Sequence, residues 1–259
     1  MPFGTGVSVD TGCRLQVSSS SVLAIALQTS GSIFINGANY NLIDSVGATP
    51  FKSNSGLTAA TLYYVYCYWD GTAVQIEFST TAFTASVYGH LVKSGDATRT
   101  YLGMVYMGAG TPGTFVDSDT QRFCASYYNR QNKPVQRTAL TGTPTTTSAT
   151  FVELTSGDKV EFIAHGEEWS SCYYNGCALN ATVGNICGAA VGVNGTAVAL
   201  APNLFNQPVA AAYAMPIAGN IGYKFTAGYN YINMLGKSSG GTVCTFAGAN
   251  CGFGAMLRQ

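Results

Sequence analysis

The sequence contains little charge. Asp, Glu, Lys and Arg make up 9% of its 259 residues, whereas soluble domains average about 25%. Disorder does not explain this composition, because disordered chains also lack aromatic residues, and this chain has 16 Tyr and 13 Phe. A surface with so few charges suits a chain that packs against copies of itself or against other proteins, where every buried charge would need a partner.

Clusters of basic residues and long apolar runs are also lacking. The formal net charge is zero, so the electrostatic attraction that drives nucleic-acid binding is missing, and we expect no nucleic-acid partner. The most apolar stretch, 188–201, is short and interrupted by Asn194, which predicts no membrane insertion. The first ten residues, MPFGTGVSVD, contain neither the charged nor the apolar region of a secretory signal, so none is predicted.

Residue types that serve catalysis are sparse. The chain has two histidines, His90 and His165, and no G-x-S-x-G motif precedes a helical pattern. We interpret His90 as an ordinary strand residue. His165 is followed by Glu167, Glu168 and Trp169, a combination that could cleave or bind a sugar. Adjacent carboxylates point to opposite sides of a strand, so we favour a polar loop between two strands.

Metal and cofactor motifs do not occur either. The spacing of Cys172, Cys177 and Cys187 contains no C-x2-C pair, and no His-x3–5-His partner accompanies it. We therefore predict no catalytic residue, no metal ligand, no cofactor and no enzymatic activity. The rival hypothesis is a carbohydrate-active or carbohydrate-binding β protein, such as a depolymerase or a lectin-like module. A depolymerase would need two carboxylates at a set separation, and the close pairs are Asp117/Asp119 and Glu167/Glu168.

What the sequence does contain is strand signals. Runs rich in Tyr, Val, Thr and Ile alternate with clusters of Gly, Asn, Asp and Ser, which is typical of sandwiches and barrels. Asn36-Gly37 and Asp70-Gly71 predict hairpin turns, because the central residues of such turns need positive φ. Pro208 and Pro216 bracket the best helical candidate, PVAAAYAMPIAG, too closely for more than two turns. The predicted strands are Ser32–Ile35, Thr61–Trp69, Leu102–Met107, Phe151–Leu154 and Lys159–Ala164.

The chain divides near residue 138. The segment Thr138–Thr150 is rich in Thr, Gly and Pro and has the character of a linker. We predict an all-β protein with an N-terminal β domain over residues 1–137 and a C-terminal β-sandwich over residues 138–259.

Residues 57–130 contain six short pieces whose order and spacing resemble a domain common in tail-fibre and other structural proteins of tailed bacteriophages. The preceding SIFINGANYNLID also fits, since members of that family often place an INGxxY hairpin before the domain. The pieces are Leu57, the aromatic strand Leu62–Tyr68, Ser79-Thr80-Thr81, Gly95-Asp96 with Thr98-Arg99-Thr100, Leu102–Val105, and Asn129-Arg130.

The resemblance implies a structural protein of a virion: a tail, neck or head fibre, a spike, or a capsid decoration. It further implies a homotrimer whose residues 1–137 attach to other virion proteins and trimerise. Residues 138–259 would then form a jelly-roll-like head that is exposed on the particle and contacts the host surface, for example a host cell-surface glycan. Such a particle assembles in the host cytoplasm and is extracellular after lysis.

The eight cysteines depart from the family pattern. Five of them, Cys172, Cys177, Cys187, Cys244 and Cys251, lie in turn-rich sequence of the C-terminal half. Because a released particle meets an oxidising environment, we expect disulfides among these five. Closeness in sequence favours Cys172–Cys187 and Cys244–Cys251, and cross-links between chains through Cys13 or Cys124 are the alternative. Cys67, within an apolar strand, is expected to be buried and reduced.

Overall fold

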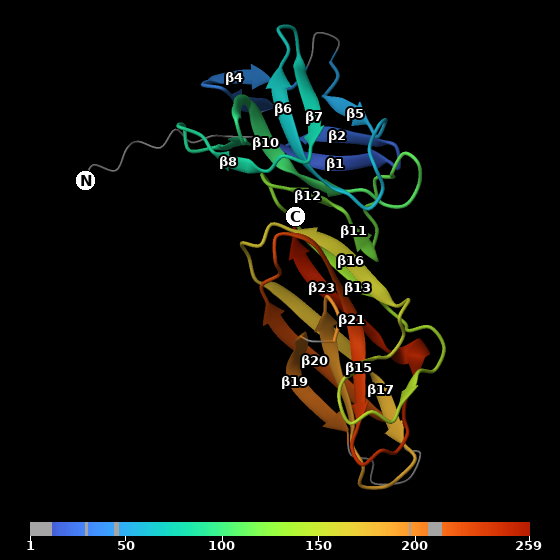
Figure 1. Cartoon of the computed structure of the whole chain (residues 1–259). Helices are drawn as coiled ribbons and strands as arrows, with labels where there is room; N and C mark the ends of the chain where they lie inside the picture. The colour runs from blue at the N-terminus through green and yellow to red at the C-terminus, as the bar shows by residue number, and fades with distance from the viewer. Residues whose placement is uncertain (1–11, 29–30, 44–46, 197, 207–213) are drawn as a thin grey trace, which may run out of the picture. The chain divides into compact units, whose positions relative to one another are not determined.

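The computed structural model describes residues 12–28, 31–43, 47–196, 198–206 and 214–259, which form two compact units (Figure 1). The N-terminal unit contains the described residues up to Asp117, together with Phe123–Gln131 and Gln259. The C-terminal unit contains Ser118–Arg122 and Asn132–Arg258. Strand β13 (Asn132–Arg137), which the sequence analysis assigned to the N-terminal domain, thus belongs to the C-terminal unit.

The N-terminal unit consists of two sheets and a separate hairpin. One sheet has the order β1 (Cys13–Ser19), β2 (Val22–Leu27) and β5 (Phe51–Ser53). The other has the order β7 (Val74–Ser79), β6 (Leu62–Trp69), β10 (Asp96–Tyr106), β9 (Leu91–Lys93) and β8 (Phe83–Ala85), with β12 (Cys124–Ser126) also paired to β10. The hairpin joins β3 (Ser32–Ile35) to β4 (Ala38–Asn41).

Alternating apolar residues of these strands form one core. Leu15 and Ile25 of the first sheet, Ile33 of the hairpin, and Val65 and Ile76 of the second sheet all belong to the same buried cluster. Burial of such side chains is worth about 1.5–3 kcal/mol each, so this core holds the sheets of the unit together.

Both predicted hairpins of this unit form, but the predicted two-residue turn is confirmed only at Asn36-Gly37. Asn36 and Gly37 have φ values of 46° and 89°, as a two-residue turn requires. The turn after β6 is longer than the predicted Asp70-Gly71 pair, because β7 begins only at Val74. The Asp70 carboxylate accepts hydrogen bonds from the backbone N–H groups of Thr72 and Ala73, and these bonds hold the pKa of Asp70 below its usual value.

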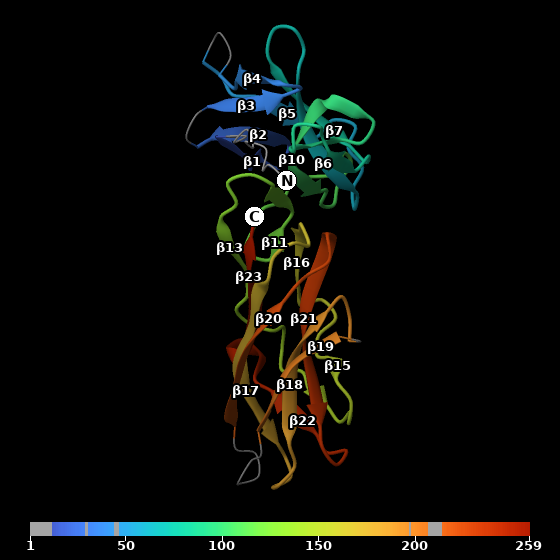
Figure 2. The ribbon, with the colours of Figure 1, turned by 90° about the vertical axis from the view of Figure 1, so that its left-hand side faces the viewer.

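The C-terminal unit is a sandwich of two sheets, seen as two layers in Figure 2. The first, here called the β21 sheet, has the order β11 (Gln121–Arg122), β16 (Lys159–Ala164), β21 (Gly228–Ser238), β18 (Cys187–Val193) and β19 (Val198–Asn206), with β15 (Val152–Glu153) paired to β21. The second, the β17 sheet, has the order β13, β23 (Gly252–Arg258), β17 (Ser170–Asn180), β22 (Cys244–Phe246) and β14 (Thr145–Thr146), with β20 (Met215–Tyr223) paired to β17.

The two sheets of this unit share a core. Inward residues of the β17 sheet, such as Tyr174 and Phe253, belong to one buried cluster with Phe162, Ile232 and Met234 of the β21 sheet. The described strand pairs are antiparallel except β11 with β16. The predictions of an all-β fold and of a C-terminal β-sandwich are therefore confirmed.

Helical structure is minor in the part of the chain that the structure describes. It contains a short 3-10 helix, η1 (Gly248–Asn250), and no helix that is long and apolar enough to span a membrane. Of the best helical candidate, residues 208–213 lie outside the described residues, and Met215–Gly219 belong to strand β20.

Candidate functional site

A disulfide joins the two sheets of the C-terminal sandwich. It links Cys187 of β18 to Cys244 of β22, with 5.6 Å between the Cα atoms. The predicted pairs Cys172–Cys187 and Cys244–Cys251 are therefore wrong. Their error has a physical cause, because strand register and not closeness in sequence decides which residues meet: Cys172 lies opposite Ala255 within the β17 sheet, and Cys187 belongs to the other sheet.

The other six cysteines are free thiols, and all of them except Cys177 are buried. Cys67 is buried and reduced, as expected. Burial raises the pKa of the Cys13 and Cys172 thiols to about 12, and it raises the pKa of Cys67 and Cys251 as well. Because the thiolate is the reactive form, these groups should be inert in the folded protein.

The difference in burial between Cys177 and the other free cysteines predicts a single reactive thiol. On brief treatment of the native protein with iodoacetamide at pH 8, Cys177 should be alkylated first, because its side chain is only partly buried. Peptide mass spectrometry identifies the modified residue, and the urea-unfolded protein, in which all free thiols react, is the control. Alkylation of Cys13 or Cys172 as fast as that of Cys177 would contradict the burial described above.

The structure places the C-terminal histidine and its neighbouring carboxylates in a loop, and Asp119 beside Arg122. His165 to Trp169 connect β16 to β17 as a loop, as predicted. Arg258 forms an ion pair with Glu168, with 3.4 Å between Arg258 Nη1 and Glu168 Oε1. Asp119 forms an ion pair of 2.8 Å with Arg122.

His90 lies just before β9 and is buried against aromatic rings. Its ring contacts Phe34 edge to face, and its Nδ1 atom lies 2.9 Å from Ser86 Oγ. Burial lowers the pKa of His90, so the neutral ring is favoured. His90 is therefore part of the packing of the N-terminal unit. Among the described residues, no group of three or more His, Cys, Asp and Glu side chains could hold a metal ion.

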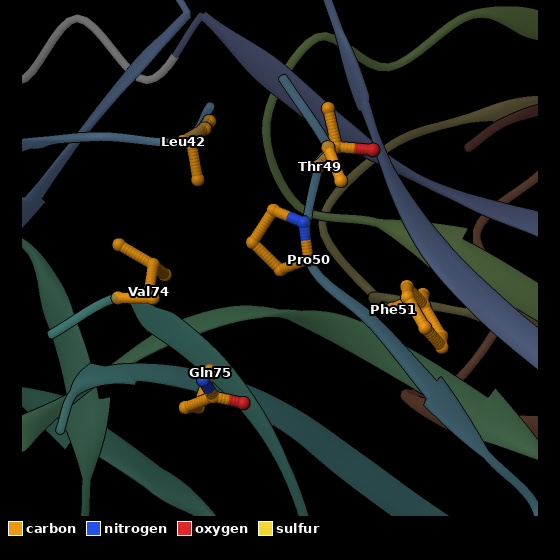
Figure 3. A pocket seen from close by; sticks show the side chains of 8 residues that line it. Leu42, Thr49, Pro50, Phe51, Val74 and Gln75 are labelled. Carbon is orange, nitrogen blue, oxygen red and sulfur yellow. The ribbon is translucent and has the colours of Figure 1, made fainter. Parts of the chain in front are cut away.

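A small pocket opens in the N-terminal unit, with a volume of about 170 Å³ (Figure 3). Leu42, Pro50 and Val74 form its apolar wall, and Thr49 and Gln75 supply polar groups. These residues bring no acid, base or nucleophile that could act on a bound molecule.

The outer face of the β17 sheet carries little charge. Arg258, at the end of β23, lies on this face, and the register of the four adjacent strands further brings together thirteen uncharged residues. They are Pro134 and Gln136 of β13, Gly252, Gly254 and Met256 of β23, Ser171, Tyr173, Asn175 and Cys177 of β17, and Pro216, Ala218, Asn220 and Gly222 of β20.

Trp169 extends this face at the start of β17. It is 74% exposed, although a side chain so large and apolar is usually well buried. A Cβ atom built on Gly222 of β20 would lie 3.5 Å from Cε3 of Trp169, so the ring rests on the bare backbone of a glycine.

Tyr173 repeats the arrangement on the opposite side of β17. A Cβ atom built on Gly254 of β23 would lie 2.7 Å from the Tyr173 hydroxyl oxygen, which donates a hydrogen bond of 2.7 Å to Gln136 Oε1. Ser171, between the two aromatic residues, donates a hydrogen bond of 2.8 Å to Asn220 Oδ1. The face therefore carries two aromatic rings with hydroxyl and amide groups between them. The sequence indicated Trp169 as a possible sugar-binding residue. No sequence pattern pointed to Tyr173 or to the two glycines.

Comparisons with known proteins give weak similarities. No protein-family model matches the chain, and no curated protein sequence does. Among solved structures, the VP2 subviral particle of infectious bursal disease virus is 13% identical over 96% of this chain and 74% of that chain, with a TM-score of 0.35. The Gx strain of the same virus gives 14% identity, 92% and 70% coverage, and a TM-score of 0.34. The insecticidal delta-endotoxin Cry8Ea1 from Bacillus thuringiensis is 9% identical over 96% of this chain and 52% of that chain, with a TM-score of 0.30. Similarity at this level assigns no function to the chain.

Proposed function

We propose that this chain is a structural protein of a tailed-bacteriophage virion, of the fibre, spike or decoration kind, without enzymatic activity. The N-terminal unit would attach to other virion proteins and form a homotrimer. The C-terminal sandwich would face outward, where it can contact the host surface. The protein would assemble in the host cytoplasm and become extracellular on lysis.

The observation that carries the proposal is that the pieces resembling phage fibre proteins meet in one sheet. The aromatic strand Leu62–Tyr68 lies in β6, which pairs with β10, and β10 contains Leu102–Val105. The Tyr66 hydroxyl donates a 2.7 Å hydrogen bond to the carbonyl oxygen of Thr81. Pieces that are far apart in the sequence thus belong to one structural element, which supports their interpretation as a single domain.

Asn129 and Arg99 tie further pieces to the same unit. Asn129 Nδ2 donates a hydrogen bond of 2.9 Å to the Cys13 carbonyl oxygen. Arg99 Nε lies 2.7 Å from Glu77 Oε2. Burial alone would raise the pKa of Glu77, but hydrogen bonds from Lys93 and Arg99 lower it overall. These residues therefore have defined structural roles within the proposed attachment domain.

The disulfide supports the extracellular part of the proposal. Disulfides persist in oxidising surroundings and are rare in reducing cytosol. A cross-link between the two sheets of the sandwich suits a protein that must remain folded outside a cell.

Sedimentation equilibrium tests the oligomer. At micromolar concentration the purified chain should sediment with three times the monomer mass of 27.0 kDa, because a surface with so little charge favours association. A stable monomer would contradict the homotrimer.

Detection of the chain in purified particles tests the virion assignment directly. Peptide mass spectrometry of density-banded particles should identify the protein. Immunogold labelling with an antibody against the C-terminal sandwich should then mark the particle surface. Particles that form without the chain and never contain it would exclude a virion role.

A further inference from the structure

The outer face of the β17 sheet has two aromatic rings at a defined spacing. Trp169 directly precedes β17 and Tyr173 is four residues further along, so extended chain separates their Cα atoms by about 13 Å. The Trp169 ring lies over Gly222 of β20, and the Tyr173 hydroxyl oxygen lies over Gly254 of β23. Because glycine has no side chain, both aromatic side chains can lie close to the sheet, and the Trp169 ring is 74% exposed to solvent.

From this arrangement we propose that the outer face of the β17 sheet binds a neutral oligosaccharide along strand β17. The apolar C–H face of a pyranose ring stacks on a flat aromatic ring, and Trp169 and Tyr173 each offer one. Between them, the Ser171 hydroxyl and the Asn220 amide can exchange hydrogen bonds with sugar hydroxyls. The spacing of the two rings suits a chain of several sugar units and not a monosaccharide.

The small number of charged residues on this face favours a neutral ligand. Thirteen neighbouring residues of the face are uncharged, and its charged residue, Arg258, lies at the end of β23. Arg258 forms an ion pair of 3.4 Å with Glu168, the residue before Trp169, so these two charges compensate each other. Along Ser171 to Cys177 of β17 an acidic sugar or a phosphate would find no positive charge on the face, and a desolvated charge without a partner is costly.

The polar groups favour a glycan over a second protein surface. Ser171 and Asn175 lie on β17, between β23 and β20, and Asn220 lies opposite Tyr173 on the neighbouring strand β20. A protein surface that covers them would need a matched partner for each polar group, because burying an unpaired amide or hydroxyl is unfavourable. A sugar carries hydroxyl groups that both donate and accept, so it can satisfy them all.

Binding by this face does not depend on the virion assignment, and only its use in host contact rests on the proposed function. A particle that lacks the chain, together with intact sugar binding by the purified protein, would overturn the proposed function alone. A particle that contains the chain, without any sugar binding, would overturn the present inference alone.

Intrinsic fluorescence provides the binding test. The chain has two tryptophans, Trp69 and Trp169, so a Trp69→Phe variant reports on Trp169 alone. Titration with neutral oligosaccharides of glucose, galactose and mannose should change the Trp169 emission in a saturable way for at least one of them. A sialylated oligosaccharide of the same length should bind more weakly. No response to any neutral oligosaccharide would overturn the proposal.

Variants measured by titration calorimetry test the site. Trp169→Ala and Tyr173→Ala should each weaken binding about tenfold or more, since a lost aromatic contact is worth roughly one decade in affinity. Tyr173→Phe keeps the ring and should bind as the wild type does. Trp69→Ala, which removes an aromatic residue stacked on Tyr40 in the other unit, is the matched control and should not weaken binding.

Two further outcomes would also overturn the proposal. Equal binding by the wild type and Trp169→Ala would place the sugar elsewhere. A change in sedimentation of Trp169→Ala without any sugar binding would indicate that the face holds a second copy of the chain. An aromatic ring over a glycine can also simply stabilise a sheet, so thermal unfolding is measured for each variant. If Trp169→Ala does not fold, Asn220→Ala and Trp169→Leu test the same contacts.

Discussion

Replacing Cys187 and Cys244 together by Ala should lower the free energy of unfolding by about 4 kcal/mol, because the disulfide closes a loop with a sequence separation of 57 residues. Both sulfur atoms are fully buried between the two sheets, so their loss also removes packing. Urea unfolding followed by far-UV circular dichroism measures the difference. The wild type in excess dithiothreitol should shift towards the double variant.

A second double variant separates the cross-link from the packing. Cys172→Ala with Cys251→Ala also removes two fully buried sulfur atoms from the same core, but no bond joins them. Its expected loss is about 2 kcal/mol, from burial alone. Equal losses in the two double variants would contradict the cross-link, as would a free thiol at Cys187 in non-reduced peptide maps.

The disulfide also indicates where sequence reasoning fails in this chain. Cysteines near one another in sequence suggested Cys172–Cys187 and Cys244–Cys251, since short loops close easily. In a sandwich, neighbours in space are set by which strands face each other across the core. Cys187 and Cys244 meet because β18 and β22 lie in opposite sheets, and no local pattern encodes that pairing.

Local features were predictable because they depend on residues that are adjacent in the sequence. Asn36-Gly37 takes positive φ at both positions, and the tendency to do so belongs to the two residues themselves. The alternating KVEFIA segment predicted strand β16 over its whole length, Lys159–Ala164. At Phe151–Leu154 the strand is shorter than predicted and covers only Val152–Glu153, because its pairing with β21 extends over two residues.

The candidate sugar-binding face could be predicted from the sequence only in part. The exposed Trp169 could be noticed in the sequence beside His165 and Glu167, which suggested sugar chemistry. Its true neighbours are Gly222 and Asn220, which only the register of β17 with β20 brings alongside. A functional surface built across strands is therefore invisible until the pairing is known.

Asp158→Ala should lower the free energy of unfolding by about 3 kcal/mol. Asp158 is 2% exposed and accepts hydrogen bonds from both the backbone N–H and the hydroxyl of Thr141, at 2.6 and 2.9 Å. It also forms an ion pair of 3.0 Å with Arg137 Nη1. The substitution leaves the Thr141 donors and the Arg137 guanidinium without their acceptor. Urea unfolding at pH 7 gives the measurement.

A double-mutant cycle assigns the effect to the ion pair. Arg137→Met alone should be destabilising, because it leaves a buried carboxylate without its counter-charge. Asp158→Ala with Arg137→Met should lose less than the sum of the two single changes, since each removes the same contact. The expected difference is about 1 kcal/mol, below that of a fully buried pair, because the Arg137 side chain is 29% exposed. If the losses in the free energy of unfolding were strictly additive, Asp158 would act through Thr141 alone. Its role would then be to anchor the chain that follows β13.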